Sequence, residues 1–135
     1  KLGLPIAFHT GRDPLSPNLI HCPPDVLGKI ADLFPRLTII AAHMGGMYLP
    51  EEAAKHLADK PNVYFDTAFA SHFLDVAGFT ELVKLRGADH VLFATDSPWS
   101  TLPAEKALLD AADLTPAEKE AIAWKNAEEL FGISI

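Results

Sequence analysis

Four ionisable side chains occupy similar places in the sequence, each at the end of a short and almost wholly apolar stretch. They are His9, His43, Asp66 and Asp96. Imidazole nitrogens and carboxylate oxygens together suit Zn²⁺ or a similar first-row dication, and a catalytic site needs about three protein ligands with a position left for water. If these side chains meet, the chain has the groups to hold a cation and to activate a water molecule.

Each of the four also has a structural interpretation. A histidine after an apolar run is often a hydrogen-bonded structural residue, and an aspartate where a strand gives way to a helix is often an N-cap. Their recurrence at equivalent positions favours a shared site, because the carboxyl ends of neighbouring parallel strands converge on one rim.

The elements that must position these groups follow from apolar runs of strand length alternating with amphipathic runs of helix length. Strands are expected at residues 4–8, 37–42, 63–65 and 91–94. Helices are expected at residues 24–34, 51–58, within 72–86 with a bend near Gly78, at 103–112 and at 115–131. Each pair spans about 30 residues, the size of a βα unit, so the sequence predicts an α/β fold with four such units and a parallel sheet.

Composition excludes several classes of function. The 135 residues suffice for one domain, and a formal net charge of −7 without a basic cluster argues against nucleic acid as a partner. Cys22 is the only cysteine, which excludes an intrachain disulfide. No apolar run reaches the roughly 20 residues needed to span a bilayer. We expect a soluble, cytoplasmic protein that acts on a small molecule.

At these residues the sequence resembles the metal-dependent amidohydrolase superfamily, in its amidohydrolase-related (amidohydrolase 2) branch. The resemblance rests on five phrases that occur in order along nearly the whole chain: Phe8-His9-Thr10-Gly11, Ala42-His43-Met44-Gly45-Gly46, Val63-Tyr64-Phe65-Asp66-Thr67, Phe93-Ala94-Thr95-Asp96-Ser97-Pro98 and Asn126-Ala127-Glu128-Glu129-Leu130-Phe131-Gly132. The branch includes both hydrolases and metal-dependent decarboxylases.

The resemblance implies a TIM (β/α)₈ barrel in which the four strands are the fifth to the eighth. It makes His9 and Asp96 ligands of a divalent metal, Zn²⁺ or else Mn²⁺. It makes His43 the sixth-strand histidine that orients water or substrate, and it gives Asp96 the further task of shuttling a proton. Asp66 matches a seventh-strand position for which we infer only a supporting or capping role.

The sequence departs from the family at the first strand, where members carry a His-x-His or Glu-x-His pair that this chain lacks. A closed barrel takes about 250 residues, so residues 1–135 are expected to form the carboxyl-terminal half of one. The start at Lys1, with Lys1-Leu2-Gly3 like the end of a helix, favours a cut from a longer polypeptide. The alternative is completion by another subunit through self-association.

The expected mechanism is hydrolysis of an amide, ester or lactone by a metal-activated water. Asp96 would take and return the proton, and His43 would stabilise the developing oxyanion. Arg12, His72 and Trp99 are candidate substrate-binding residues, because they follow strand ends and loops on that rim carry specificity. Solvent exposure of Arg12 and packing of Trp99 are their structural alternatives.

Three other interpretations remain open. The same groups suit decarboxylation. The missing first-strand pair favours a non-catalytic half-barrel that works as an assembly module. An open, flavodoxin-like sheet that binds a nucleotide ranks last, because no Gly-x-Gly-x-x-Gly or Walker loop follows the first strand.

Overall fold

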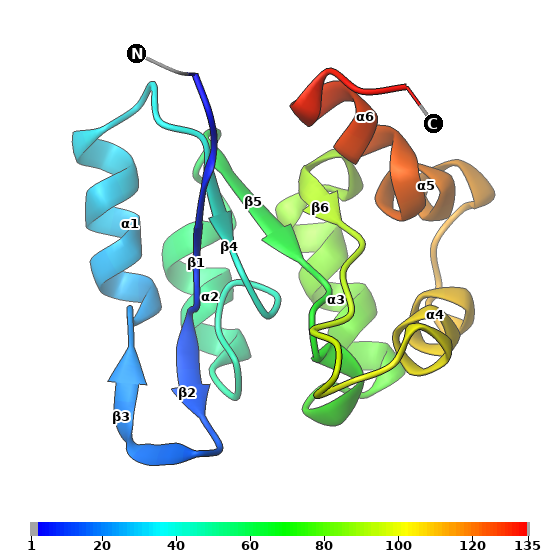
Figure 1. Cartoon of the computed structure of the whole chain (residues 1–135), viewed down its shortest axis with the longest axis horizontal. Helices are drawn as coiled ribbons and strands as arrows, with labels where there is room; N and C mark the ends of the chain where they lie inside the picture. The colour runs from blue at the N-terminus through cyan, green and yellow to red at the C-terminus, as the bar shows by residue number, and fades with distance from the viewer. Residues whose placement is uncertain (1–2, 135) are drawn as a thin grey trace.

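A computed structural model describes residues 3–134 and contains a four-stranded parallel sheet (Figure 1). The strands, in the order β1-β4-β5-β6, are β1 (Ile6–Phe8), β4 (Ile39–Ala41), β5 (Val63–Asp66) and β6 (Val91–Leu92). All pairs are parallel, so the four carboxyl ends lie at one edge of the sheet, as the sequence predicts. We call this edge the carboxyl rim.

Helices follow each strand. They are α1 (Pro24–Leu33), α2 (Pro50–Leu57), α3 (Val76–Arg86), α4 (Leu102–Ala111), α5 (Pro116–Glu120) and α6 (Asn126–Phe131). Short 3₁₀ turns occur at η1 (Ala70–His72) and η2 (Ala88–His90). None of the described helices is long and apolar enough to cross a membrane. The expected α/β fold and its parallel sheet are confirmed.

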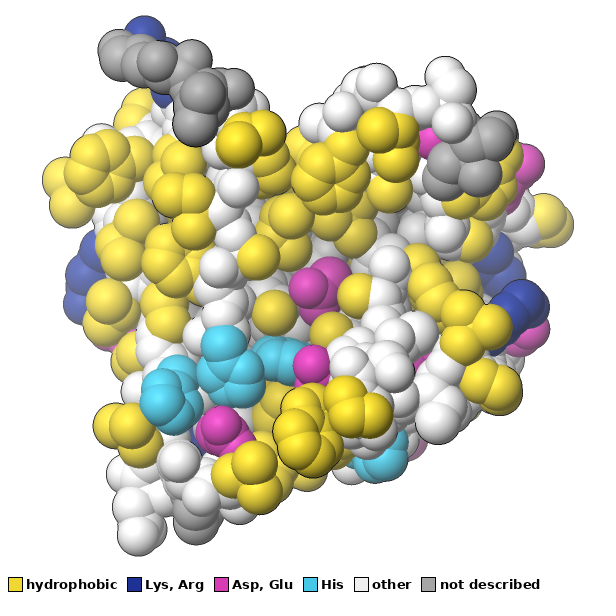
Figure 2. Space-filling model, viewed as in Figure 1, with side chains coloured by type: hydrophobic (Ala, Val, Ile, Leu, Met, Phe, Trp, Pro, Cys, Tyr) yellow, Lys and Arg dark blue, Asp and Glu magenta, His cyan; other side chains and the backbone are white. Residues whose placement is uncertain are grey.

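The core lies between the sheet and the helices, mainly α1 to α3, with α4 and the last helix also contributing residues. Ile39, Val63 and Phe65 are fully buried there, with Leu27 of α1 and Phe79 of α3. Burial follows from the near-continuous apolar runs of the strands. Exposed apolar side chains remain on β1 and just before it, where Ile6 is 46% and Leu4 68% exposed. Figure 2 shows hydrophobic side chains gathered on the face of the molecule that it presents.

Two details of the predicted helices differ. The bend expected near Gly78 is absent, because α3 begins after the 3₁₀ turn and Asp75 caps it by accepting a hydrogen bond from the Gly78 amide. The last helix contains a π-helical turn, η3 (Ala121–Lys125), between α5 and α6. The Ile122 carbonyl in this turn accepts the Phe93 N–H at 3.0 Å, which ties the helix to β6. The helix end expected at Lys1-Leu2 lies outside the described residues.

A hairpin that the sequence analysis did not predict follows β1. Its strands are β2 (Gly11–Asp13) and β3 (Ser16–His21), so Arg12 lies on a strand and not in the loop where it was expected. The Asp13 carboxylate accepts the Leu15 N–H at 2.7 Å and stabilises the turn. Backbone bonds from Arg12 N–H to the Met47 carbonyl and from Met47 N–H to the Thr10 carbonyl join the hairpin to the segment after β4.

Candidate active site

The structure brings the two strand-end histidines into direct contact. His43 Nε2 lies 2.9 Å from His9 Nδ1, and His43 Nδ1 lies 3.0 Å from the Ala68 carbonyl oxygen. A carbonyl can only accept, so His43 carries its proton on Nδ1 and accepts with Nε2 from His9 Nδ1–H. The neutral His9 ring therefore keeps the lone pair on its other nitrogen, Nε2. Partial burial, reinforced by His43, lowers the pKa of His9 and favours this neutral form.

Asp66 holds His43 in place through the backbone. Its Oδ1 accepts the His43 N–H at 2.9 Å and the Ala68 N–H at 3.1 Å. Burial raises the pKa of Asp66, and these two amide donors act in the opposite direction. Asp66 therefore fixes the backbone at His43 and Ala68, and the supporting role inferred for it from the sequence stays a prediction.

Several residues at the carboxyl rim have left-handed backbone conformations that non-glycine residues rarely adopt. The φ angles are +61° at His43, +52° at Met44, +61° at Phe69 and +62° at Asp96. Such conformations cost on the order of 1–3 kcal/mol each and cluster at functional sites. Two of the four residues first selected for their chemistry are among them.

Thr67 positions the segment that leads from β6 to Asp96. The Thr67 hydroxyl donates to the Ala94 carbonyl at 2.8 Å and accepts the Ala94 N–H at 2.9 Å, so a side chain continues the pairing that β6 ends at Leu92. This explains why the predicted strand 91–94 is shorter in the structure. Asp96 then turns back, and its carbonyl accepts the Trp99 N–H at 2.8 Å.

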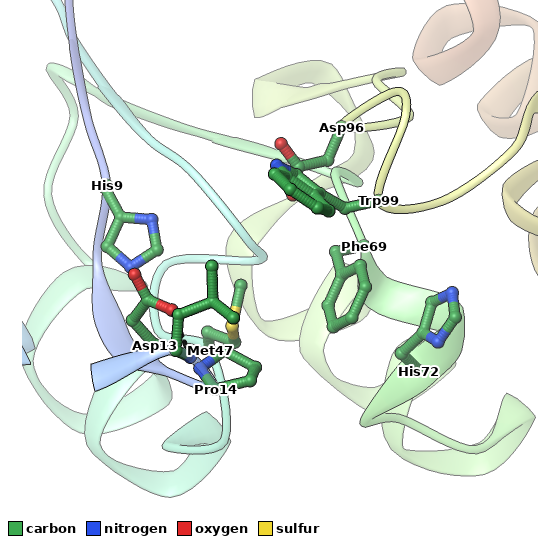
Figure 3. A pocket seen from close by; sticks show the side chains of 9 residues that line it. His9, Asp13, Pro14, Met47, Phe69, His72, Asp96 and Trp99 are labelled. Carbon is green, nitrogen blue, oxygen red and sulfur yellow. Dashed lines mark hydrogen bonds between the residues drawn. The ribbon is translucent and has the colours of Figure 1, made fainter. Parts of the chain in front are cut away.

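A cavity of about 340 Å³ opens at this rim. Its lining comprises His9, Asp13, Pro14, Leu15, Met47, Phe69, His72, Asp96 and Trp99. Figure 3 shows His9 and Asp13 on one side of the cavity and Phe69 and His72 on the other, with Asp96 and Trp99 above Phe69. His9, Asp96, His72 and Trp99 were selected from the sequence, whereas Arg12 is exposed on β2 and does not line the cavity.

The sequence analysis missed residues that shape this site. Asp13 enters the cavity from the unpredicted hairpin, and its only sequence signal is the turn-forming Asp13-Pro14 pair. Thr67 and Glu105 are buried polar residues that position the last two loops. A threonine after a strand and a glutamate in an amphipathic helix look unremarkable in the sequence.

The donor types at the cavity suit a divalent cation, since an unprotonated imidazole nitrogen and a carboxylate are both good ligands. The number of donors is smaller than a complete site needs. Within residues 3–134, no group of three or more His, Cys, Asp or Glu side chains is arranged to hold a metal ion. His9 and Asp96 fit as part of a ligand set.

Solved structures with this fold include a TIM-barrel protein, Bb4693 from Bordetella bronchiseptica, with 24% identity and a TM-score of 0.77 over 96% of this chain and 46% of that one. Amidohydrolase 2 from Bifidobacterium longum subsp. infantis has 21% identity and a TM-score of 0.70, over 98% of this chain and 51% of its own. A dihydroxybenzoic acid decarboxylase from Polaromonas sp. JS666, with bound manganese and 2-nitroresorcinol, has 22% identity and a TM-score of 0.62, over 79% of this chain and 37% of its own.

At these identities the likeness concerns the fold, and the chain spans about half or less of each of these proteins. No curated protein matches the chain. The sequence profile of the amidohydrolase family, in its amidohydrolase 2 branch, matches residues 1–133. The chain therefore belongs to the amidohydrolase family.

Proposed function

We propose that residues 1–135 form the carboxyl-terminal half of the (β/α)₈ barrel of a metal-dependent hydrolase. In this proposal His9 and Asp96 supply two ligands of a divalent cation, Zn²⁺ or Mn²⁺, and the remaining ligands come from the other half of the barrel. The substrate is an amide, ester or lactone. A bound cation would polarise a water molecule and lower its pKa toward neutrality.

The hydrogen-bond chain from Ala68 through His43 to His9 carries the proposal. A metal-binding histidine usually donates its second N–H to a neighbouring acceptor, which fixes the tautomer and the ring orientation. The Ala68 carbonyl imposes this arrangement here, because it leaves His43 Nε2 as the acceptor for His9 Nδ1–H. His9 Nε2 is then the ligating atom.

The chain's own residues have distinct tasks in this reaction. Asp96 accepts the proton of the attacking water and returns it to the leaving group. Both ring nitrogens of His43 are engaged within the chain. We therefore assign His43 the positioning of His9 in place of the contact with the substrate oxygen expected from the sequence. Trp99 and Phe69 supply the apolar walls of the cavity.

Decarboxylation is the second candidate reaction. The observation that favours it is that the Polaromonas structure with this fold is a dihydroxybenzoic acid decarboxylase. In such a lyase Asp96 would act as the general acid that protonates the carbon from which carbon dioxide leaves. Product analysis separates the two reactions, since a hydrolase releases an acid with an alcohol or amine and a decarboxylase releases carbon dioxide from a hydroxybenzoate.

Metal binding is the primary test. Equilibrium dialysis of the full chain against Mn²⁺ and against Zn²⁺ should show saturable binding that His9→Ala and Asp96→Asn each weaken at least about tenfold. His56→Ala is the matched control, because His56 lies on α2 and pairs with Glu52 away from the cavity. Equal binding by all four proteins would overturn the assignment of both ligands.

We also propose that the uncovered sheet is completed by another half-barrel. Exposed Ile6 on β1 and Leu4 just before it support this, as does the unpaired outer edge that each of β1 and β6 has among the described strands. On its own the chain is then expected to self-associate through this face, the behaviour of an assembly module. Sedimentation velocity that shows only monomers across a wide concentration range would contradict this.

A further inference from the structure

A buried glutamate outside the proposed ligand set joins the two loops on one side of the cavity. Glu105 lies in the first turn of α4 and is 1% exposed. Its Oε2 accepts the Ser71 N–H at 3.0 Å, and its Oε1 accepts the Ser71 hydroxyl at 2.7 Å and the Ser100 hydroxyl at 2.5 Å. Ser71 belongs to the 3₁₀ turn after β5, and Ser100 follows Trp99 in the loop after β6.

These contacts determine the direction of the next hydrogen bond. The Ser100 hydroxyl donates its single proton to Glu105 Oε1. The buried Ser100 oxygen also lies 3.2 Å from His72 Nε2, where it has only lone pairs to offer. His72 must therefore be the donor in this contact, with its proton on Nε2. In the neutral ring the lone pair then lies on Nδ1.

The His72 ring is held at the cavity by a second contact. It stacks on Phe69 with ring centroids 4.0 Å apart and an angle of 5° between the planes. Both rings line the cavity (Figure 3). Within residues 3–134, no hydrogen-bond partner of His72 Nδ1 is recorded, whereas Nε2 is committed to Ser100.

We propose that Glu105 is a positioning residue that, through Ser100, fixes His72 as the Nε2-protonated tautomer, so that Nδ1 accepts a hydrogen bond from the substrate. This rests on the proposed function in one respect, namely that the cavity is the substrate site. The tautomer selects substrates that carry an O–H or N–H donor at this wall, because an acceptor placed there would face the Nδ1 lone pair. A hydroxyl-bearing ester or lactone, a secondary amide or a phenolic acid meets this requirement.

The substitution Glu105→Gln tests the direction of the relay without a large change of shape. The backbone N–H of Ser71 still needs the amide oxygen, so the amide nitrogen faces the two hydroxyls and donates to them. The Ser100 proton is then free to turn toward His72 Nε2. Long-range ¹H–¹⁵N correlation spectra of residues 1–135, recorded with the His72 ring neutral, should show a several-fold rise in the Nδ1-protonated share of His72.

Ser71→Ala is the matched control, because it also removes one hydrogen bond from Glu105 but leaves the carboxylate and its bond to Ser100. Its His72 tautomer should equal that of the wild type, and His72→Gln assigns the signal. A wild-type His72 protonated on Nδ1 would overturn the proposal whichever variants fold, and so would a folded E105Q with an unchanged tautomer. If E105Q does not fold, Ser100→Ala is measured instead. Because it removes the acceptor of the His72 Nε2 proton, it should speed the exchange of that proton with solvent relative to the wild type, and unchanged exchange overturns the relay.

These spectra need neither metal nor substrate, so they separate this inference from the proposed function. If His9→Ala and Asp96→Asn leave metal binding unchanged while His72 follows the tautomer predictions, the proposed ligands are refuted and the relay stays intact. If instead the chain binds metal through His9 and Asp96 but E105Q leaves the His72 tautomer unchanged, the relay is refuted and the proposed ligands stand.

Discussion

The two ends of the parallel sheet use polar residues in opposite ways. At the carboxyl rim, His43 and Asp96 are held in left-handed backbone conformations, and Asp96 and His9 face an open cavity. At the amino end, polar side chains instead donate hydrogen bonds to backbone carbonyls of the chain itself. The amino end thus satisfies backbone groups, whereas the carboxyl rim combines strained backbone with an open cavity. In βα barrels generally, stability resides at the amino end and active sites at the carboxyl end.

Three side chains establish the character of the amino end. Asn62 Nδ2 donates to the Ala31 carbonyl in the last turn of α1 and to the Phe34 and Leu37 carbonyls between α1 and β4, at 3.0 to 3.2 Å. Asn126 Nδ2 donates to the Ala88 and Val91 carbonyls, both at 2.7 Å. The Arg86 guanidinium donates to the Ala58 carbonyl at the end of α2. Each provides donors for carbonyls that no helix or strand satisfies.

At the carboxyl rim, close packing of two backbone segments depends on a glycine. Gly11 has a φ of +101°, and a Cβ there would collide with backbone atoms of Met47. The contact joins the hairpin to the segment after β4. The backbone of Met47 therefore explains why residue 11 is a glycine, and no close approach by a substrate is needed to explain it.

The largest effect is expected from Gly11→Ala, which should lower the free energy of unfolding by about 4 kcal/mol, because it adds a left-handed penalty to a backbone collision. Gly132→Ala is the matched control. Gly132 has a φ of +62° with open space around it, so it carries the conformational penalty alone, about 1 kcal/mol. Urea unfolding followed by circular dichroism measures both. Equal losses would show that the rim is not closely packed at Gly11.

A smaller effect is expected from Asn126→Ala at the amino end. Asn126 is 7% exposed, and its removal leaves two carbonyls without their donor, which should cost about 2 kcal/mol in unfolding free energy. Mn²⁺ affinity, measured by dialysis on the folded variant, should be unchanged.

Asp96→Asn at the carboxyl rim is expected to have the opposite effects on unfolding free energy and on Mn²⁺ affinity. It should leave stability within about 0.5 kcal/mol of the wild type, because Asn tolerates the left-handed backbone, while it weakens Mn²⁺ binding. If instead Asn126→Ala weakened metal binding and Asp96→Asn destabilised the fold, the contrast between the two ends would be wrong.

The sequence predicts the parallel sheet and the carboxyl-rim location of His9, His43, Asp66 and Asp96 because both depend on local patterns. Apolar runs mark the strands, and a polar residue at the end of each run must emerge at the same rim once the strands are parallel. The sequence stretch that begins at Asn126 has only the family resemblance to mark it. The structure gives it a physical reason, since its amide caps the entry to β6.

What could not be predicted depends on contacts between residues far apart in the chain. Glu105 meets Ser71 across 34 positions, and Thr67 meets Ala94 across 27. The hairpin at residues 11–21 was not predicted because Pro14 and Pro17 interrupt the alternation of apolar and polar residues that would mark its strands. The hydrogen bond between His9 and His43 also follows from strand register, which spacing alone does not provide.

The smallest expected effect concerns Tyr64, which stacks on His90 at the amino end with ring centroids 4.7 Å apart. Burial, aided by the carboxylates of Glu129 and Asp89, raises the pKa of the Tyr64 phenol. Above the ordinary tyrosine pKa of about 10 the unfolded chain loses this proton more readily than the folded chain, so stability falls as pH rises. Alkaline absorbance titration of the wild type against Tyr64→Phe should reveal one late-titrating phenol, and the variant should lose less stability between pH 9 and 11, chosen as roughly one unit either side of that value. A Tyr64 that titrates at or below its ordinary value would show that the amino end is more open to solvent than its contacts imply.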